Sequence, residues 1–457
     1  MSQQQSSATP VGALWVDLST TRQWQGPPVG IVRTEMMVAR ELLAAATPGL
    51  RFCFFDREQD DYREIAPADA ERLLRRADLE DDARSRRETF ADRRSSIRAG
   101  FETRVGAGIR RLPERLQGPV RAWGAACLQL LGASARVLGA IPPTGKRRRK
   151  ARGTGPFAAG DRYVSMGLDW DHNDFGRLGE IRRRLGLKVF LMCYDLIPID
   201  HPQYLVPGYP AVIAGHFRSL LACCDAVFAI SEHSARRLER YARDLGVPPP
   251  PTVVIRLGAD VSTAREACLP HLVSKRFVLT VGTLEVRKNH RLLYELWVRM
   301  QTDPEFPDPP ILVIVGRRGW RVDDLLDEMA QNPHASACVH HLEHVSDAEL
   351  AWLYNHCLFT VYPSFAEGLG LPVIESLARG KYCLSSNTTA LPEAGQGLTR
   401  LLDPLDFVAW YDAIKKLAGD DALLAEHEAR IRSAYVATTW RETARALDDS
   451  IRTIGMS

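Results

Sequence analysis

The chain has 457 residues, of which 45% are hydrophobic and 25% charged, and its formal net charge is +3. These values are those of a soluble globular protein, and the length favours two domains of about 200 residues each. The N-terminal segment MSQQQSSATP has neither a basic nor an apolar region, so no secretory signal is expected. Nine cysteines without a CxxC pair indicate reduced thiols and a cytosolic protein. For the vicinal pair Cys223-Cys224, an apolar helix face is favoured over a redox pair.

The first predicted strand is short and apolar, and a glycine-containing loop and a helix follow it. The strand covers Ala13–Leu18, the loop covers 25–30, and apolar residues at helical spacing extend over 31–43. This order is typical of the opening unit of a Rossmann-like domain, in which Gly30 would lie close to a ligand. Neither GxGxxG nor GxxxxGK[ST] occurs here, so a dinucleotide or P-loop site is poorly supported. A second strand at Phe52–Phe55 and a charged loop follow.

The stretch from 67 to 155 differs from the α/β pattern on both sides of it. It begins with charged, helix-like sequence, continues with an apolar amphipathic segment at 119–143, and ends with six cations in the seven residues 146–152. The uninterrupted apolar part is far shorter than the ~20 residues that a membrane span needs. Two interpretations stay open: a peripheral contact of 119–152 with an anionic membrane surface, or a helical insertion with a solvated linker. Nucleic-acid binding is disfavoured because no aromatic residues are interleaved with the basic run.

The alternation of strands and helices then resumes with three strands that are expected to be buried and parallel. They are predicted at 162–166, 188–193 and 226–230. Ligands of such sheets bind outside the carboxyl ends of the strands. Asp195 and Ser231 each follow one of these strands and are therefore placed as expected for a cleft, although Ser231 is also a plain N-cap for the next helix.

A domain link is predicted at 246–274, which begins with the proline-rich run GVPPPP. A second Rossmann-like domain follows, with strands expected at 276–281, 311–316, 337–342 and 358–362, and the chain is expected to close with helices. The pair Arg287-Lys288 stands at a strand-to-helix turn. A guanidinium donates to two oxygens at once and an ammonium adds a point charge, so this pair suits a diphosphate. A solvated charge pair is the alternative.

A glycine-rich turn and a proline follow the strand at 358–362. Gly368 and Gly370 let the backbone approach a ligand without an intervening Cβ, and Pro372 suits the first turn of a helix. We expect the N–H groups of residues 373–375 to face a phosphate, with the positive end of the helix dipole behind them.

Two carboxylates flank this turn, Glu367 before it and Glu375 in the first helical turn. Because carboxylates do not bind phosphate, we expect them to bind hydroxyls of a molecule that contains it, such as a ribose or a transferred hexose. Taken singly, Glu367 is better explained as a loop acid and Glu375 as a first-turn helix acid favoured by the dipole.

The combined string resembles the signature of family 4 nucleotide-sugar glycosyltransferases, in which two glutamates are separated by seven residues. The matching residues are Ser364, Phe365, Glu367, Gly368, Gly370, Pro372 and Glu375. Weaker resemblances support it: GxxRxE at Gly30, Arg33 and Glu35 is similar to bacterial mannosyl- and rhamnosyltransferases.

The resemblance implies the GT-B architecture, which is an α/β fold of two doubly wound Rossmann-like domains facing a central cleft. It covers about 11–66 and 160–457. The implied division is an acceptor-side domain at 1–265 with the insertion, a donor-binding domain at 266–436, and a terminal helix at 437–457 that packs back on the first domain.

The resemblance also implies roles for residues. Arg287 and Lys288 would stabilise the leaving diphosphate, Glu367 would position the sugar hydroxyls, Glu375 would bind the ribose, and Asp195 would contact donor or acceptor. Donor contacts are expected from a further set of residues, Gly30, Thr283, Gly368, Leu369, Gly370 and Leu371. Many family members have arginine where this chain has Thr283, so Arg287 or another residue must replace it.

The implied reaction is transfer of a hexose with retention of configuration, most simply by same-face attack, although a double displacement stays open. GDP-mannose is the favoured donor, ahead of dTDP-rhamnose and UDP-sugars, and the acceptor would be a lipid-linked glycan or polysaccharide of lipopolysaccharide or exopolysaccharide assembly. An epimerase, a phosphorylase and an inert binding protein are the alternatives from other classes. No cofactor or metal is expected, because cations of the chain can stabilise the diphosphate. The Asp169-Trp-Asp171 match to the DxD metal motif of the GT-A architecture is discounted for that reason. The protein is expected in the cytoplasm, at the membrane's inner face if 119–152 binds lipid.

Overall fold

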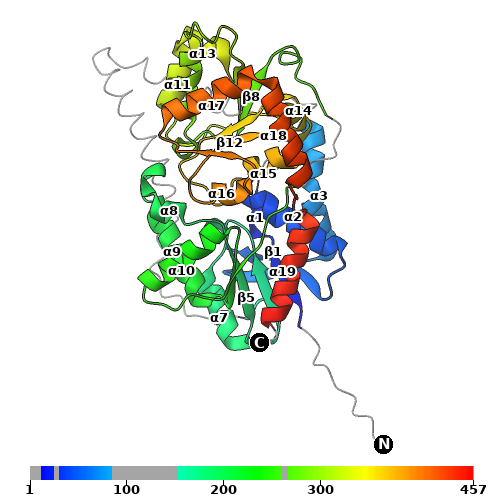
Figure 1. Cartoon of the computed structure of the whole chain (residues 1–457). Coiled ribbons are helices and arrows are strands. Elements are labelled where there is room, and N and C mark those ends of the chain that lie inside the picture. Colours follow the sequence, from blue (N-terminus) through cyan, green and yellow to red (C-terminus); the bar gives the residue numbers. More distant parts are fainter. Residues whose placement is uncertain (1–11, 25–29, 85–152, 260–265, 456–457) are drawn as a thin grey trace, which may run out of the picture. The chain divides into compact units, whose positions relative to one another are not determined.

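The computed structural model describes residues 12–24, 30–84, 153–259 and 266–455, and two parallel sheets organise them (Figure 1). Most of the predicted insertion, including the amphipathic segment 119–143 and the basic run 146–152, lies outside the described residues. The expectation of two doubly wound, Rossmann-like sheets is confirmed.

The first sheet has the strand order β3-β2-β1-β4-β5-β6-β7. Every neighbouring pair is parallel except β2 and β3. Strands β1, β4 and β6 are buried at every residue, as expected for parallel strands with helices on both faces. The strands are β1 Leu14–Asp17, β2 Leu50–Asp56, β3 Asp61–Ile65, β4 Arg162–Ser165, β5 Lys188–Cys193, β6 Ala226–Ala229 and β7 Thr252–Val254. The helices are α1 Ser19–Gln23, α2 Ile31–Ala44, α3 Pro67–Arg84, α6 Asp169–His172, α7 Phe175–Leu185, α8 Ile197–Asp200, α9 Tyr209–Cys223 and α10 Glu232–Asp244, with a 3-10 turn, η2, at Pro202–Tyr204.

The second sheet has the order β10-β9-β8-β11-β12-β13, and all of its pairs are parallel. Its strands are β8 Phe277–Val281, β9 Ile311–Val315, β10 Val339–Leu342, β11 Thr360–Tyr362, β12 Cys383–Ser386 and β13 Arg400–Leu402. Its helices are α11 His290–Met300, α12 Asp323–Gln331, α13 Pro333–Cys338, α14 Asp347–His356, α15 Leu371–Ala378, α16 Leu391–Gly395, α17 Phe407–Gly419 and α18 Asp421–Ala434, with a 3-10 turn, η3, at Val286–Lys288. We call the residues around the two sheets the first and the second domain.

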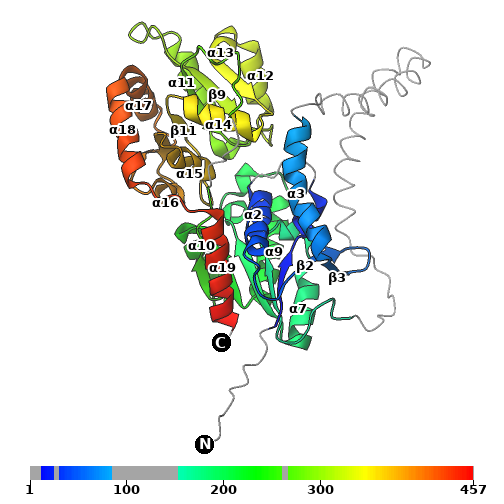
Figure 2. The same cartoon turned by 90° about the vertical axis from the view of Figure 1, so that its right-hand side faces the viewer.

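The last helix, α19 (Trp440–Gly455), packs on the first domain although it follows the second domain in the chain. Trp440, Ala444, Leu447 and Ile451 recur at helical spacing and belong to the same apolar core as β1 and β5. Figures 1 and 2 show α19, coloured red, alongside α2.

Four strands lie where the sequence predicted a loop, a domain link or helices. β3 lies in the expected charged loop and pairs antiparallel with β2. It was not predicted because only Tyr62 and Ile65 of DYREI are buried, and two apolar residues do not show a clear strand period. β7 begins what was predicted to be the domain link and joins the first sheet. β12 and β13 lie where only helices were expected, and they extend the second sheet.

Candidate active site

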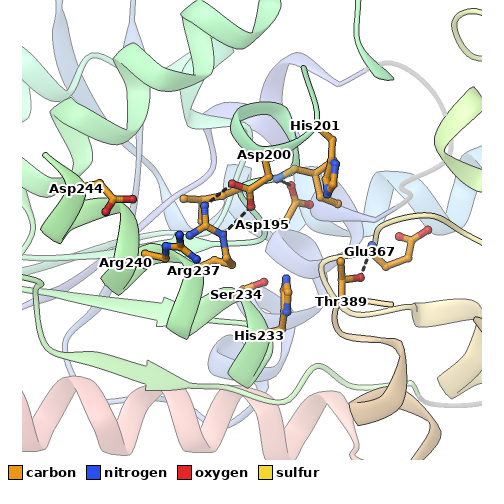
Figure 3. A pocket seen from close by; sticks show the side chains of 12 residues that line it. Asp195, Asp200, His201, His233, Ser234, Arg237, Arg240, Asp244, Glu367 and Thr389 are labelled. Atoms are coloured by element: carbon orange, nitrogen blue, oxygen red, sulfur yellow. Dashed lines mark hydrogen bonds and ion pairs between the residues drawn. The ribbon is translucent and has the colours of Figure 1, made fainter. Parts of the chain in front are cut away.

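The residues predicted to bind the donor lie beyond the carboxyl ends of three strands. β5 leads to Asp195, β8 leads to Arg287 and Lys288 in η3, and β11 leads to Glu367. Parallel strands of one sheet end at a common edge, so η3 and Glu367 meet there. Asp195 comes from the first sheet, and it lines the same cavity as Glu367 (Figure 3).

Glu367 is 7% exposed, and each of its carboxylate oxygens contacts a cation. Oε2 lies 2.7 Å from Nη1 of Arg287, and Oε1 lies 2.7 Å from Nζ of Lys288. The hydroxyl of Tyr362 also donates to Oε1 at 3.0 Å. Arg287 forms a second ion pair, with Glu285 at 2.5 Å. The structure therefore brings three of the four predicted catalytic residues into direct contact.

The charges of this cluster fix the protonation state of Glu367. Burial alone would raise the pKa of this carboxyl, but the Coulombic attraction of Arg287 and Lys288 outweighs burial and lowers the pKa from 4.5 to about 2. Burial lowers the pKa of Lys288 from 10.5, against the attraction of Glu367. Burial also raises the pKa of Asp195, which Arg287 partly offsets. Glu367 is thus ionised at every physiological pH and has no proton to donate.

Gly368 lies directly against the first domain and has no room for a side chain. A Cβ there would stand 2.6 Å from the carbonyl oxygen of Tyr194 and 3.0 Å from Cβ of Asp195. The hydroxyl of Ser231 donates to the Gly368 carbonyl at 2.7 Å, and it also accepts from the N–H of Ser234 at 3.1 Å. The prediction that Ser231 is an N-cap is confirmed, and the same hydroxyl holds the glycine-rich turn.

The free N–H groups of this turn lie earlier in the chain than predicted. The N–H groups of Val373 and Ile374 donate to the carbonyl of Gly370, so the expectation that residues 373–375 face a phosphate is wrong for these two. The turn closes one step earlier because Gly370 is the N-cap of α15, with a φ of 99°. The N–H groups of 368–371 donate to none of the described residues. They are the groups available to an anion at this end of α15.

Glu375 lies beyond the first turn of α15, because this helix begins at Leu371, so its predicted first-turn position is wrong; its side chain is partly exposed. The hydroxyl of Tyr354 donates to its Oε2 at 2.9 Å. Its Oε1 lies 3.7 Å from Nη1 of Arg33, which belongs to α2 of the first domain. The side chains of Arg33 and Glu375 are 28% and 24% exposed, so both remain accessible to a ligand.

Comparison with known proteins identifies the domain that holds this cluster. Residues 269–432 match the family model described as glycosyl transferases group 1. This match covers most of the second domain, which we therefore call the group 1 domain. O-antigen chain mannosyltransferase B of Escherichia coli is 34% identical over 162 residues, which cover 34% of this chain and 41% of that protein. The serotype-specific mannosyltransferase WbdA of Escherichia coli is 25% identical over 294 residues, which cover 58% of this chain and 34% of that protein.

The chain thus spans less than half the length of either curated relative. Among solved structures, HepE of Anabaena in complex with UDP matches with a TM-score of 0.50 and 15% identity, over 64% of this chain and 79% of that chain. This likeness concerns the fold alone, which is GT-B, and the parts of the chain that match curated proteins resemble bacterial mannosyltransferases.

Two predicted donor contacts lie at the edges of the cluster. Thr283 of the group 1 domain is exposed and follows β8. Gly30 is the N-cap of α2, with a φ of 51°, next to the undescribed residues 25–29. Arg287 was expected to replace the arginine that family members have in place of Thr283. Its donors are engaged by Glu367, by Glu285 and by the Ala366 carbonyl at 2.6 Å.

Two residues of the group 1 domain near the site were not predicted. Thr389 accepts the N–H of Glu367 at 2.8 Å and has a φ of 51°, which is unfavourable for a β-branched residue. Glu393 accepts the N–H groups of Glu232 and His233, at 2.8 Å and 2.7 Å, and so caps the N-terminus of α10. No local sequence pattern predicts the cap that Glu393 provides, because it comes from 160 residues away in the chain. Ser231 already supplies a local N-cap for α10, so nothing in the sequence indicated a second one.

A group of buried carboxylates in the first domain was also missed. Asp17, Glu35 and Asp169 are at most 4% exposed. Asp17 is the last residue of β1, Glu35 lies on α2, and Asp169 begins α6. Asp169 accepts hydrogen bonds from Ser165 at 2.5 Å and from Asn173 at 2.6 Å. Asp169 therefore faces the interior, which agrees with discounting Asp169-Trp-Asp171 as a metal motif. The apolar residues of β1 and α2 predicted that these elements are buried. They did not predict that three acids would lie close together.

Three further observations concern the described residues only. No group of His, Cys, Asp and Glu side chains among them is arranged to hold a metal ion. Their helices are all too short or too polar to cross a bilayer. Their cysteines, including Cys223 and Cys224, are free thiols.

Proposed function

We propose that the protein is a retaining glycosyltransferase that transfers mannose from GDP-mannose to a hydroxyl of a lipid-linked or polysaccharide acceptor. The observation that supports this best is the junction of Glu367, Arg287 and Lys288 with the unbonded N–H groups at 368–371. Two cations and a helix N-terminus suit a diphosphate. The choice of mannose and of O-antigen assembly rests on the two mannosyltransferases that the chain resembles.

In the proposed reaction, the bond between the sugar C1 and the diphosphate oxygen breaks as a bond from C1 to the acceptor oxygen forms on the same face. The proton of the acceptor hydroxyl passes to the departing diphosphate. Negative charge grows on the diphosphate, and Lys288, Arg287 and the N–H groups at 368–371 stabilise it there. Because these groups are already in place, they need no reorganisation at the moment of reaction.

Glu367 contributes as an anion in this scheme. With a pKa of about 2 it gives no proton to the leaving group, so the acceptor proton must leave by another route. Its oxygens hold Arg287 and Lys288 in place and accept from sugar hydroxyls. Asp195 approaches the same cavity from the first domain and orients the reacting hydroxyl. No step requires a metal ion.

The first test is a thermal-shift series with GDP, UDP, dTDP, ADP and NAD, with and without Mg²⁺. We expect GDP to raise the melting temperature equally in both conditions, because a ligand at a hundred times its Kd stabilises the protein by about 2.7 kcal/mol. Transfer from GDP-mannose in the presence of EDTA is the matching activity assay. A shift with UDP or dTDP instead would replace the donor, and a shift with NAD alone would refute the proposal.

Arg33→Met is expected to weaken GDP binding by about tenfold and to leave guanosine binding unchanged. Both terminal nitrogens of Arg287 are already engaged, whereas Arg33 has, among the described residues, a single ion pair, the 3.7 Å contact with Glu375. A hydrogen bond to a charged group contributes about 1.5–3 kcal/mol, which corresponds to at least a tenfold change in affinity. Calorimetry with both ligands checks the result, and Arg33→Lys is expected to fall between wild type and Arg33→Met. An equal loss for guanosine would contradict a role at the diphosphate.

A further inference from the structure

The cavity that contains Glu367 extends into the first domain, where it has a second group of polar residues. Its volume is about 380 Å³, within the range of small-ligand sites. Asp200, at the end of α8, forms an ion pair with Arg237 of α10 (Figure 3). Nε of Arg237 donates to Oδ2 of Asp200 at 2.8 Å. Neither Arg287 nor Lys288 lines this cavity, so most of its wall lies apart from the predicted diphosphate site.

One donor of the Asp200–Arg237 pair is left for a ligand. Nη1 of Arg237 is buried and has no hydrogen-bond partner among the described residues. An unmet buried donor is costly, so such atoms in native proteins call for a partner. Asp200 is 24% exposed and retains lone pairs. The pair therefore offers one donor and one acceptor side by side, which is the pattern that two neighbouring sugar hydroxyls satisfy.

The charge of the lining argues against a phosphate in this place. Four carboxylates, those of Asp195, Asp200, Asp244 and Glu367, face two arginines. One of these arginines, Arg237, is already neutralised by Asp200. Burial lowers the pKa of His233 below its ordinary value of 6.5, so this side chain adds no positive charge at neutral pH. Glu367 is likewise neutralised by Arg287 and Lys288, whereas Asp195 and Asp244 form no ion pair among the described residues. An anionic group would meet the negative charge of these two, whereas hydroxyl groups can donate to them.

A stack of aromatic rings, of which His201 lines the cavity, lies beside the polar pair. His201 lines the cavity and stacks on Tyr204 with ring centroids 5.4 Å apart. Tyr204 in turn stacks on Phe365 at 5.8 Å. Phe365 belongs to the glycine-rich segment of the second domain, so this stack joins the two groups of residues. A pyranose ring has an apolar C–H face as well as hydroxyls, and both find partners here.

We propose that this cavity is the acceptor subsite and that it binds a neutral, hydroxyl-rich terminal sugar, with Asp200 and Arg237 holding two of its hydroxyls. The acceptor is then a glycan end and not a lipid phosphate. This inference rests on the proposed function. It places the reacting hydroxyl of that sugar at the end of the cavity where Glu367 and Asp195 lie.

Saturation-transfer NMR on the GDP-saturated protein tests the subsite. The neutral probes are the methyl glycosides of mannose, glucose, galactose and N-acetylglucosamine, and citronellyl phosphate is the anionic probe. We expect at least one glycoside to bind and citronellyl phosphate not to compete with it. Asp200→Asn and Arg237→Met should weaken that glycoside at least tenfold, with Arg237→Lys between them and wild type. Arg243→Met, on the same helix with a 61% exposed side chain paired to Glu239, is the matched control and should bind normally.

The GDP-induced thermal shift, measured on every variant, separates the possible failures. A normal shift with no glycoside binding, with binding unaffected by Arg237→Met, or with citronellyl phosphate displacing the glycoside would overturn the subsite and leave the proposed function standing. If GDP gives no shift but a glycoside still binds through Arg237, the proposed function fails and the sugar site stands. If neither GDP nor any glycoside bound, both the proposed function and the acceptor subsite would be refuted.

Discussion

Lys288→Ala is expected to lower kcat for sugar transfer by about 10²–10³-fold, the usual cost of removing one group that stabilises charge in a transition state. Lys288 is one of the two cations bound to Glu367, and Gly282 leaves room for its side chain, since a Cβ there would stand 3.4 Å from Cε of Lys288. The charge that it neutralises appears only as the bond to the diphosphate breaks. The loss should therefore appear mainly in kcat, with a smaller effect on KM for the donor.

Steady-state kinetics with GDP-mannose check this prediction, and Lys415→Ala is the control. Lys415 also forms an ion pair, with Asp303 at 2.8 Å, but on α17, away from the cluster. We expect Lys415→Ala to retain its activity. Near-normal kcat for Lys288→Ala would show that the diphosphate lies elsewhere and would remove the main support for the site.

The sequence pointed to this candidate site because its signature is local. Glu367, Gly368 and Glu375 lie within nine residues, and the strands before them are recognisable as apolar runs. Strands β8 to β11 were predicted for the same reason, whereas β12 and β13 were not. The free N–H groups were misplaced because helix onset depends on the φ of Gly370, which composition does not specify.

The residues that the sequence could not supply are those joined only by the fold. Tyr354 reaches Glu375 from α14, and Arg33 reaches it from α2. Asp200 and Arg237 are 37 residues apart, and each alone is an ordinary helix-end or surface charge. Strands β3 and β7 were missed because short edge strands need few apolar residues. All of these contacts and strand pairings join residues that are far apart in the chain. A single sequence does not show which distant residues come into contact.

The buried carboxylates of the first domain lead to the second large prediction, which concerns stability. Burial and the neighbouring charge of Asp17 raise the pKa of Asp169 from 3.8 to about 7. Burial raises the pKa of Asp17 itself to about 6, and burial also raises that of Glu35. Each acid is therefore harder to ionise in the folded protein than in the unfolded chain.

The sign of the pH dependence follows from these directions. Below about pH 4, Asp169 is protonated in both states and its ionisation has no effect on stability. As the pH rises from about 4 to 7, the unfolded chain ionises while the folded protein resists, so stability falls. A change of pKa from 3.8 to about 7 corresponds to on the order of 4 kcal/mol, reached in full above pH 7.

Asp169→Asn should remove this penalty, because the amide oxygen can still accept from Ser165 and Asn173. We expect the variant to melt several degrees above wild type at pH 8 and at nearly the same temperature at pH 4.5. Calorimetry at half-unit pH steps measures the difference, with the exposed Asp412→Asn as a control that should show no such trend. A difference independent of pH would mean that the pKa of Asp169 is the same in the folded protein as in the unfolded chain. If the trend holds, the buried acids of the first domain destabilise the folded protein. They lie next to α2, which also bears Arg33. Residues that lower stability in this way are expected near functional sites.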